Sequence, residues 1–166
     1  MGNKNSKSKE IKKIDDDRFA TSEELRIIAV SRDAFAIRFI KNPSVVVQKI
    51  AVLKDPEVLE YITCIDEEVQ KIAVKLDPDV IRYIHVPSEE VQKIAVAEHG
   101  YAIRYIEDPS VDVQKIAINE NVFAIECIKN PPVEIQKIAI NKNVIVFMHM
   151  KNPPEEIIQI AKAHGF

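Results

Sequence analysis

Apolar residues recur along most of this chain with helical spacing, inside a phrase that returns every 22 residues. The phrase is VQKIAV at residues 47–52, 69–74 and 91–96, and it continues as VQKIAI at 113–118 and IQKIAI at 135–140. Within each phrase the apolar positions fall on one side of a helix. The repetition therefore predicts a helix at the same place in every 22-residue segment.

Residues at the same place in successive segments form a column, and two such columns hold the same residue in every segment. With segments starting at 21, 43, 65, 87, 109, 131 and 153, the eighth place is always isoleucine and the ninth is always alanine. Small alanines let neighbouring helices approach closely, and the larger aliphatic side chains fill the space between them. The alanines are Ala29, Ala51, Ala73, Ala95, Ala117, Ala139 and Ala161.

Prolines and capping residues mark where the helices begin. Asp108, Asn130 and Asn152 each precede a proline, and we expect them to be N-caps with the proline at the first helical position. Later in the segment, Asp55-Pro56 and Asp77-Pro78 open short apolar runs with room for about two helical turns. A helix of that length is not stable alone. Each segment is therefore predicted to be a helix-turn-helix unit that depends on its neighbours.

The predicted fold is all-α: an α-solenoid of about seven 22-residue helix-turn-helix repeats with superhelical winding, over residues 21–166. The tenth place is Val or Ile in the inner repeats and becomes Lys162 in the last, as expected at a solvent-exposed end. Residues 1–20 are predicted to be a basic, flexible N-terminal tail and cap, in which Ile11, Ile14 and Phe19 can cover Ile27 of the first repeat.

The stretch PSEEVQKIAVAEHGYAIRYI at 87–106 resembles the short helical-hairpin repeats of uncharacterised phage, viral and bacterial proteins. It is also similar to leucine-rich-repeat variants and, more distantly, to HEAT and armadillo repeats. The resemblance covers about residues 21–166. It implies a right-handed α-solenoid and, as in most of these families, a protein-binding role, and it carries over no catalytic residue. The N-terminal cysteine cluster that holds iron and sulfur in the leucine-rich-repeat variant has no counterpart in this sequence, so no cofactor is inferred.

Composition narrows the function further. Residues 1–13 carry five lysines and one glutamate, so the remaining chain has a net charge of −7 within the total of −3 and is a poor partner for nucleic acid. The three glycines form no phosphate-binding loop, and the four histidines fall at four different places in the repeat. Neither an enzyme nor a metal site is expected.

The two cysteines bear on location. Cys64 and Cys127 are nearly three repeats apart, too far for a disulfide in a stacked array. Because the sequence also shows no secretory signal and no long apolar run, we expect a cytoplasmic protein.

A lysine column is the first candidate binding feature. Acids stand three residues before most of these lysines, and such pairs neutralise each other on a helix surface; Val46 holds that place before Lys49. We favour a solvated, self-neutralised face and keep a phosphate- or nucleic-acid-binding ladder as the alternative. The column consists of Lys49, Lys71, Lys93, Lys115 and Lys137.

An aromatic column with neighbouring arginines is the second candidate. Columns of this kind usually belong to a core with hydroxyl groups at its rim, and tyrosine with arginine is also the usual anchor of a protein interface. If the chain presents a binding surface to a protein partner, whose identity the sequence does not give, we expect it here. The residues are Tyr61, Arg82, Tyr83, Arg104 and Tyr105.

Two further features carry alternatives. The glutamines at 48, 70, 92, 114 and 136 are expected to hold the repeats together by hydrogen bonds, or else to contact a partner's backbone. Gly2 and Ser6 match the pattern for N-myristoylation, and the adjacent lysines supply the second membrane signal that one acyl chain needs. We favour an unmodified polar tail and keep a membrane-tethered adaptor, with Gly2 acylated, as the alternative.

Overall fold

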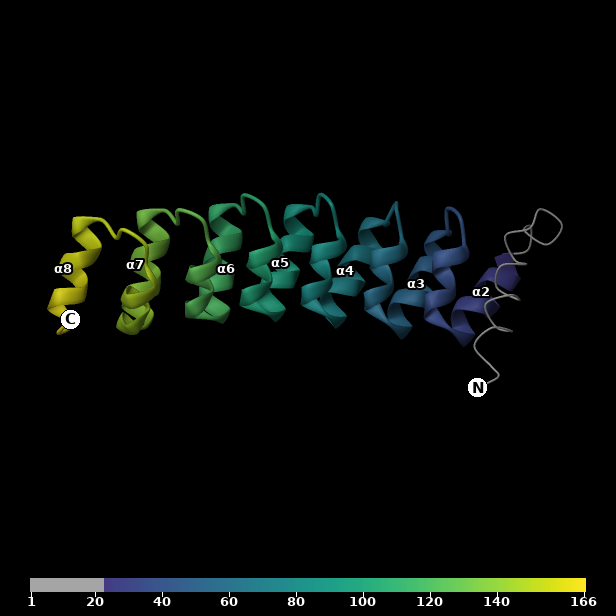
Figure 1. The fold of residues 1–166 in the computed structure, drawn as a ribbon, viewed down its shortest axis with the longest axis horizontal. Helices are drawn as coiled ribbons and strands as arrows, with labels where there is room; N and C mark the ends of the chain where they lie inside the picture. Colours follow the sequence, from purple (N-terminus) through teal and green to yellow (C-terminus); the bar gives the residue numbers. More distant parts are fainter. Residues whose placement is uncertain (1–22) are drawn as a thin grey trace, which may run out of the picture. The chain divides into compact units, whose positions relative to one another are not determined.

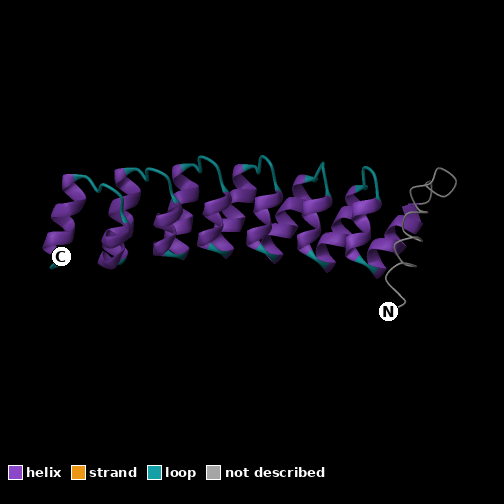
Figure 2. Cartoon of the chain, in the orientation of Figure 1, coloured by secondary structure: helices purple, strands orange, loops and turns teal. Residues whose placement is uncertain are grey.

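The computed structural model of the chain describes residues 23–166, and this part consists of helices and loops without a strand (Figures 1 and 2). The contacts divide the chain into two compact units. Unit 1 ends at Ile84, and unit 2 runs from His85 to Phe166. Each unit is described by itself below.

Both units alternate an α-helix with a short 3₁₀ helix. Unit 1 contains α2 (Glu23–Arg32), η2 (Ala34–Phe39), α3 (Val45–Lys54), η3 (Pro56–Tyr61), α4 (Glu67–Leu76) and η4 (Pro78–Tyr83). Unit 2 contains α5 (Glu89–Glu98), η5 (Gly100–Tyr105), α6 (Val111–Glu120), η6 (Val122–Cys127), α7 (Val133–Lys142), η7 (Val144–His149) and α8 (Glu155–Ala163). The predicted all-α array of helical repeats is confirmed.

The second helix of each repeat is a 3₁₀ helix, which the sequence pattern did not distinguish from an α-helix. Its six residues rise about 2 Å each and span about 12 Å, close to the roughly 15 Å of a ten-residue α-helix. The short segment therefore covers most of the length of the α-helix against which it packs.

The core of each unit comes from the repeat columns. The alanines at the ninth place and the Val or Ile at the tenth are buried, as predicted; in α3, for example, Ala51 and Val52 are fully buried. The 3₁₀ helices add one to three buried residues each, such as Val58 and Leu59 of η3. Lys162 is exposed in α8, as expected for the last repeat.

The prediction that Asp108, Asn130 and Asn152 are N-caps is wrong. These residues have left-handed backbone conformations, with φ between 47° and 50°, and the α-helices begin three residues later. Asn and Asp tolerate this conformation better than other non-glycine residues, which explains their place in the turn. The following proline lies outside the helix.

Serine is the N-cap of α3, α5 and α6. The hydroxyl groups of Ser44 and Ser110 accept hydrogen bonds from the N–H groups of Val47 and Val113. Pro132 and Pro154 occupy the same place before α7 and α8, and neither side chain caps its helix. The last two α-helices therefore lack a side-chain cap that α3 and α6 have.

The 3₁₀ helices are capped as the sequence predicts. Asp55 and Asp77 accept hydrogen bonds from the N–H groups two residues later, and proline stands at the first helical position. At the start of η5 the cap is supplied differently, since the His99 side chain makes no capping hydrogen bond. There the N–H of Gly100 donates to Glu120 Oε2 from α6, at 2.5 Å.

Candidate binding surface

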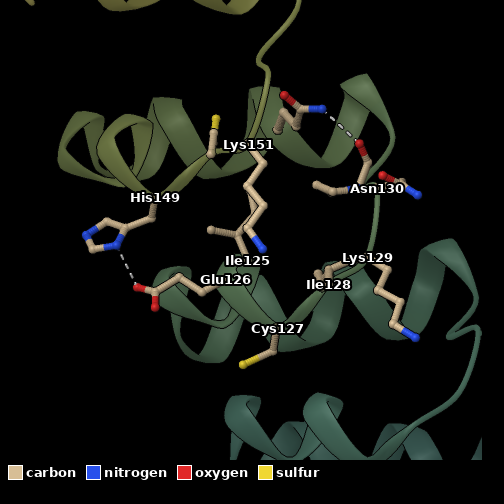
Figure 3. Close-up of a pocket in the computed structure, with 11 residues that line it drawn as sticks. Ile125, Glu126, Cys127, Ile128, Lys129, Asn130, His149 and Lys151 are labelled. Carbon is tan, nitrogen blue, oxygen red and sulfur yellow. Dashed lines mark hydrogen bonds and ion pairs between the residues drawn. The ribbon is translucent and has the colours of Figure 1, made fainter.

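Three open hollows lie where a 3₁₀ helix ends and the loop to the next α-helix begins. Hollow 1, in unit 1, has a volume of about 600 Å³ and lies between residues 38–43 and residues 61–64. Hollow 2, in unit 2, has about 430 Å³ and lies between 104–109 and 127–129. Hollow 3, with about 240 Å³, lies between 125–131 and 149–151 (Figure 3). The three sites are equivalent positions of the 22-residue repeat.

Two tyrosines of the predicted aromatic column line hollows 1 and 2. Tyr61 lies in hollow 1 and Tyr105 in hollow 2, and their exposed fractions are 41% and 37%. The expectation that the column is part of the core is therefore wrong for these two residues. In η3 the inner positions are filled by Val58 and Leu59, which leaves Tyr61 at the outer edge. Further along the same column, Cys127 and His149 line hollow 3.

In unit 1, Arg82 and Tyr83 form a cluster with Glu57. Arg82 pairs with Glu57 Oε1 at 2.7 Å, and the Tyr83 hydroxyl donates to Glu57 Oε2 at 2.8 Å. The Arg82 guanidinium also lies over the Tyr83 ring, 4.5 Å from its centre. The structure thus brings Arg82 and Tyr83 together as predicted, through an acid that the sequence analysis had not singled out.

The tyrosines of unit 1 titrate above the usual range. The pKa of Tyr61 is raised, chiefly because its hydroxyl is hydrogen-bonded to the Glu60 carboxylate. For Tyr83 the hydrogen bond with Arg82 lowers the pKa, but the hydrogen bond to Glu57 and desolvation outweigh it and leave the pKa raised. Both hydroxyl groups therefore remain neutral donors at physiological pH.

In unit 2, Arg104 lies between two tyrosines. Its Nε donates to the carbonyl of Tyr101 at 2.9 Å, and its guanidinium lies 5.3 Å from the ring centre of Tyr101 and 5.6 Å from that of Tyr105. Arg104 and Tyr105 both line hollow 2. The structure places these two predicted residues side by side at an accessible site.

The glutamine column ties each α-helix to the loop before it. Each Nε2 donates to the carbonyl five residues earlier, at 2.8–3.0 Å. Gln48 also accepts on its Oε1 from the N–H of Asp66, the N-cap of the next α-helix, at 3.2 Å. The predicted hydrogen bonds from one repeat to the next are seen for Gln48, whereas the contacts to the carbonyl five residues earlier lie within a single repeat.

Two glutamines of unit 2 lack the second contact. The Oε1 atoms of Gln114 and Gln136 are buried and have no hydrogen-bond partner. The residues 18 positions later, where Asp66 serves Gln48, are Pro132 and Pro154, and proline has no N–H to donate. Gln114 lines hollow 2 and Gln136 lines hollow 3. The doubled prolines at 131–132 and 153–154 were the signal in the sequence for these unpaired oxygens.

Hollow 3 is shown in Figure 3. Glu126 and His149 point toward each other across its rim, with His149 Nδ1 3.0 Å from Glu126 Oε1. Cys127 lies below them, and burial raises the pKa of its thiol. Lys151 extends over the hollow from the loop after η7. The rim therefore carries positive and negative side chains, and the raised pKa favours the protonated form of the thiol.

The lysine column is largely occupied by ion pairs, but the predicted spacing is seen only for Lys71, which pairs with Glu68 at 3.1 Å. Lys93 pairs with Glu89, one turn earlier, at 2.9 Å. The partners of Lys115 and Lys137 are Glu134 and Glu156 of the next α-helix, at 2.8 and 2.5 Å. Neighbouring α-helices are close enough for a long lysine side chain to reach the first turn of the next helix, and residue spacing within one helix does not predict such a pair.

Several predictions concern residues outside the described part of the chain. Gly2, the basic tail and the cap formed by residues 10–20 all precede residue 23. Within residues 23–166, both cysteines are free thiols, no group of acidic, histidine or cysteine side chains could hold a metal ion, and no helix is long and apolar enough to cross a membrane.

Comparison with known proteins adds no relative to this picture. No protein-family model, no curated protein and no solved structure matches the chain.

Proposed function

We propose that the repeats bind a protein partner, without catalysis, through extended segments of that partner that lie in the hollows of each unit. The observation that carries this proposal is that the hollows recur at one position of the repeat, and that hollows 1 and 2 are each lined by an arginine and a tyrosine, Arg38 with Tyr61 and Arg104 with Tyr105. A repeated site of this kind suits a ligand that is itself a chain of similar units.

The chemistry of the column supports a protein ligand. Tyrosine and arginine are the residues that most often dominate the energy of protein interfaces. In unit 2, Arg104 is already held by the carbonyl of Tyr101 and by the two neighbouring rings. Since its side chain is ordered before binding, less conformational entropy is lost when a partner arrives.

Ion pairing of the lysines supports a protein over a nucleic acid. A phosphate-binding surface needs free cations that release counterions, whereas Lys71, Lys93, Lys115 and Lys137 are each paired with a carboxylate. The two free thiols suit a reducing compartment, and we place the activity in the cytoplasm.

Selection from a displayed peptide library, with the full chain as bait, tests the proposal. We expect peptides that bind with micromolar affinity. Peptides that occupy hollow 1 should weaken at least tenfold with Tyr61→Ala, and peptides that occupy hollow 2 should weaken as much with Tyr105→Ala, because each replacement removes a half-exposed anchor. Leu53→Ala is the matched control, since Leu53 is 62% exposed and lies outside the hollows. It should leave the affinity within twofold.

Two outcomes would contradict the proposal. In the first, no peptide is enriched over a bait-free selection. In the second, enriched peptides bind the two tyrosine variants as well as they bind the unmodified protein, which would place their site away from the hollows.

A further inference from the structure

Hollows 2 and 3 of unit 2 share a feature that sets them apart from the well-paired repeat of unit 1. Each has in its wall a glutamine whose Oε1 is buried and without a partner, Gln114 in hollow 2 and Gln136 in hollow 3. Both side chains are only 8% exposed. A buried acceptor without a donor is unfavourable, and it becomes favourable when a ligand supplies the donor.

The remaining contacts leave these amides less restrained than Gln48. Gln48 is held at both ends, by the carbonyls of Pro43 and Cys64 on Nε2 and by the N–H of Asp66 on Oε1. Gln114 and Gln136 are held through Nε2 alone, by the carbonyls of Pro109 and Pro131. Because the oxygen is covered in the free protein, a donor reaches it when the amide turns toward the hollow.

We propose that Gln114 and Gln136 accept hydrogen bonds from two main-chain N–H groups of a bound polypeptide in the polyproline II conformation. This inference rests on the proposed function and names the conformation of the partner segment and the atoms that recognise it. The two residues occupy the same place in consecutive repeats, on the neighbouring helices α6 and α7.

The spacing of the two acceptors selects the conformation. Packed helices lie about 8–10 Å apart, so the two amides are separated by about one such step. A polyproline II chain has three residues per turn and rises about 3.1 Å per residue, so N–H groups three residues apart point the same way and lie about 9 Å apart. In a β-strand the same two groups would point to opposite sides. The backbone of polyproline II has no internal hydrogen bonds and is free to donate.

The test uses peptides recovered by the display selection and the double variant Pro132→Ser/Pro154→Ser. Serine at these places supplies the missing N–H to each glutamine oxygen, as Asp66 does for Gln48. We expect the variant to unfold at a higher temperature and to bind the peptides at least tenfold more weakly, because the acceptors are then occupied within the protein. The matched control is Pro56→Ser/Pro78→Ser, which replaces two prolines that line none of the three hollows and should leave the affinity within twofold.

A scan of N-methylated peptides gives the second measurement. Methylation removes one main-chain N–H at a time, and we expect two positions three residues apart to lose at least tenfold in affinity for the unmodified protein. The same two methyl groups should have little effect on binding to the double serine variant, whose glutamines no longer accept from the ligand.

Failure of this inference can be told apart from failure of the proposed function. If no peptide binds, the proposed function is wrong. If peptides bind and depend on Tyr105, but the serine variant binds them as tightly as the unmodified protein does, the hollows bind polypeptide without the glutamine oxygens. Sensitive N-methyl positions two residues apart would instead indicate a β-strand and would overturn the polyproline II assignment.

Discussion

Replacing Pro132 by serine should stabilise the protein, because two favourable contributions together exceed one unfavourable contribution. The serine hydroxyl can cap α7 as Ser44 and Ser110 cap α3 and α6, which contributes about 1 kcal/mol. Its N–H can donate to the unpaired Oε1 of Gln114, which contributes about 1 kcal/mol more. Loss of the proline makes the unfolded chain more flexible and costs about 0.7 kcal/mol.

The net gain is therefore about 1.3 kcal/mol, or roughly 4 °C in the midpoint of thermal unfolding for a chain of this size. Thermal melts followed by circular dichroism, together with urea titrations, measure it. The hydrogen bond can be separated from the cap by repeating the substitution in a Gln114→Met background. There only the cap and the proline term remain, and the gain should fall to about 0.3 kcal/mol.

The mirror-image change in unit 1 provides a control of opposite sign. Asp66→Pro removes both the N–H that serves Gln48 and the side chain that caps α4, and it makes the unfolded chain less flexible. The same three terms with reversed sign give a loss of about 1.3 kcal/mol. The reasoning fails if Pro132→Ser gains nothing. It also fails if the gain is the same with methionine at 114, because the hydrogen bond would then have no part in it.

Three further predictions concern other contacts. Gly100→Ala should destabilise the protein by about 2–4 kcal/mol, measured by urea titration. A Cβ at this position would lie 2.6 Å from the carbonyl oxygen of Ala117 and would disturb the hydrogen bond to Glu120. A loss of stability below about 0.5 kcal/mol would contradict this close approach. The free energy of unfolding should fall as the pH rises above about 10, because three tyrosine hydroxyl groups have a raised pKa in the folded state. The folded state holds their protons more tightly than the unfolded state does, and this advantage is lost as the hydroxyl groups ionise. Unchanged unfolding midpoints between about pH 9 and 11.5 would refute the prediction. The tyrosines with a raised pKa are Tyr61, Tyr83 and Tyr101. Cys64 should react with a thiol reagent several times faster than Cys127 at pH 8, because Cys64 is exposed while burial raises the pKa of Cys127. The Cys127→Ser and Cys64→Ser variants measure the two rates separately. Equal rates would contradict the prediction.

The fold could be predicted from the sequence because the same residue types recur at the same positions of successive repeats, and these positions include the buried ones. Alanine at the ninth place and Val or Ile at the tenth specify which side of each α-helix packs inward, and both columns are buried as expected. The exact helix starts could not be predicted in the same way. An Asn before a proline can be an N-cap, or it can be a turn residue with positive φ two positions before the N-cap. The φ angle of Asn130 shows that it is the turn residue.

The candidate site was predictable in its residues and not in its contacts. Tyr61, Arg104 and Tyr105 do line hollows, but the partners that hold the column, such as Glu57, come from neighbouring repeats. Pairing between repeats depends on the distance from one helix to the next, which a pattern within one segment does not contain. For the same reason the lysine partners Glu134 and Glu156 were missed.

The bond from Gly100 to Glu120 means that the repeats are not interchangeable parts. The start of η5 is completed by a side chain of α6, so residues 87–108 carry an unfinished helix end when they are moved elsewhere in an array. A shortened or shuffled version of this protein would need either a glutamate 20 residues after the glycine or an aspartate in place of His99. Whether arrays assembled from these segments fold should depend on whether the start of η5 has a side chain that accepts this hydrogen bond.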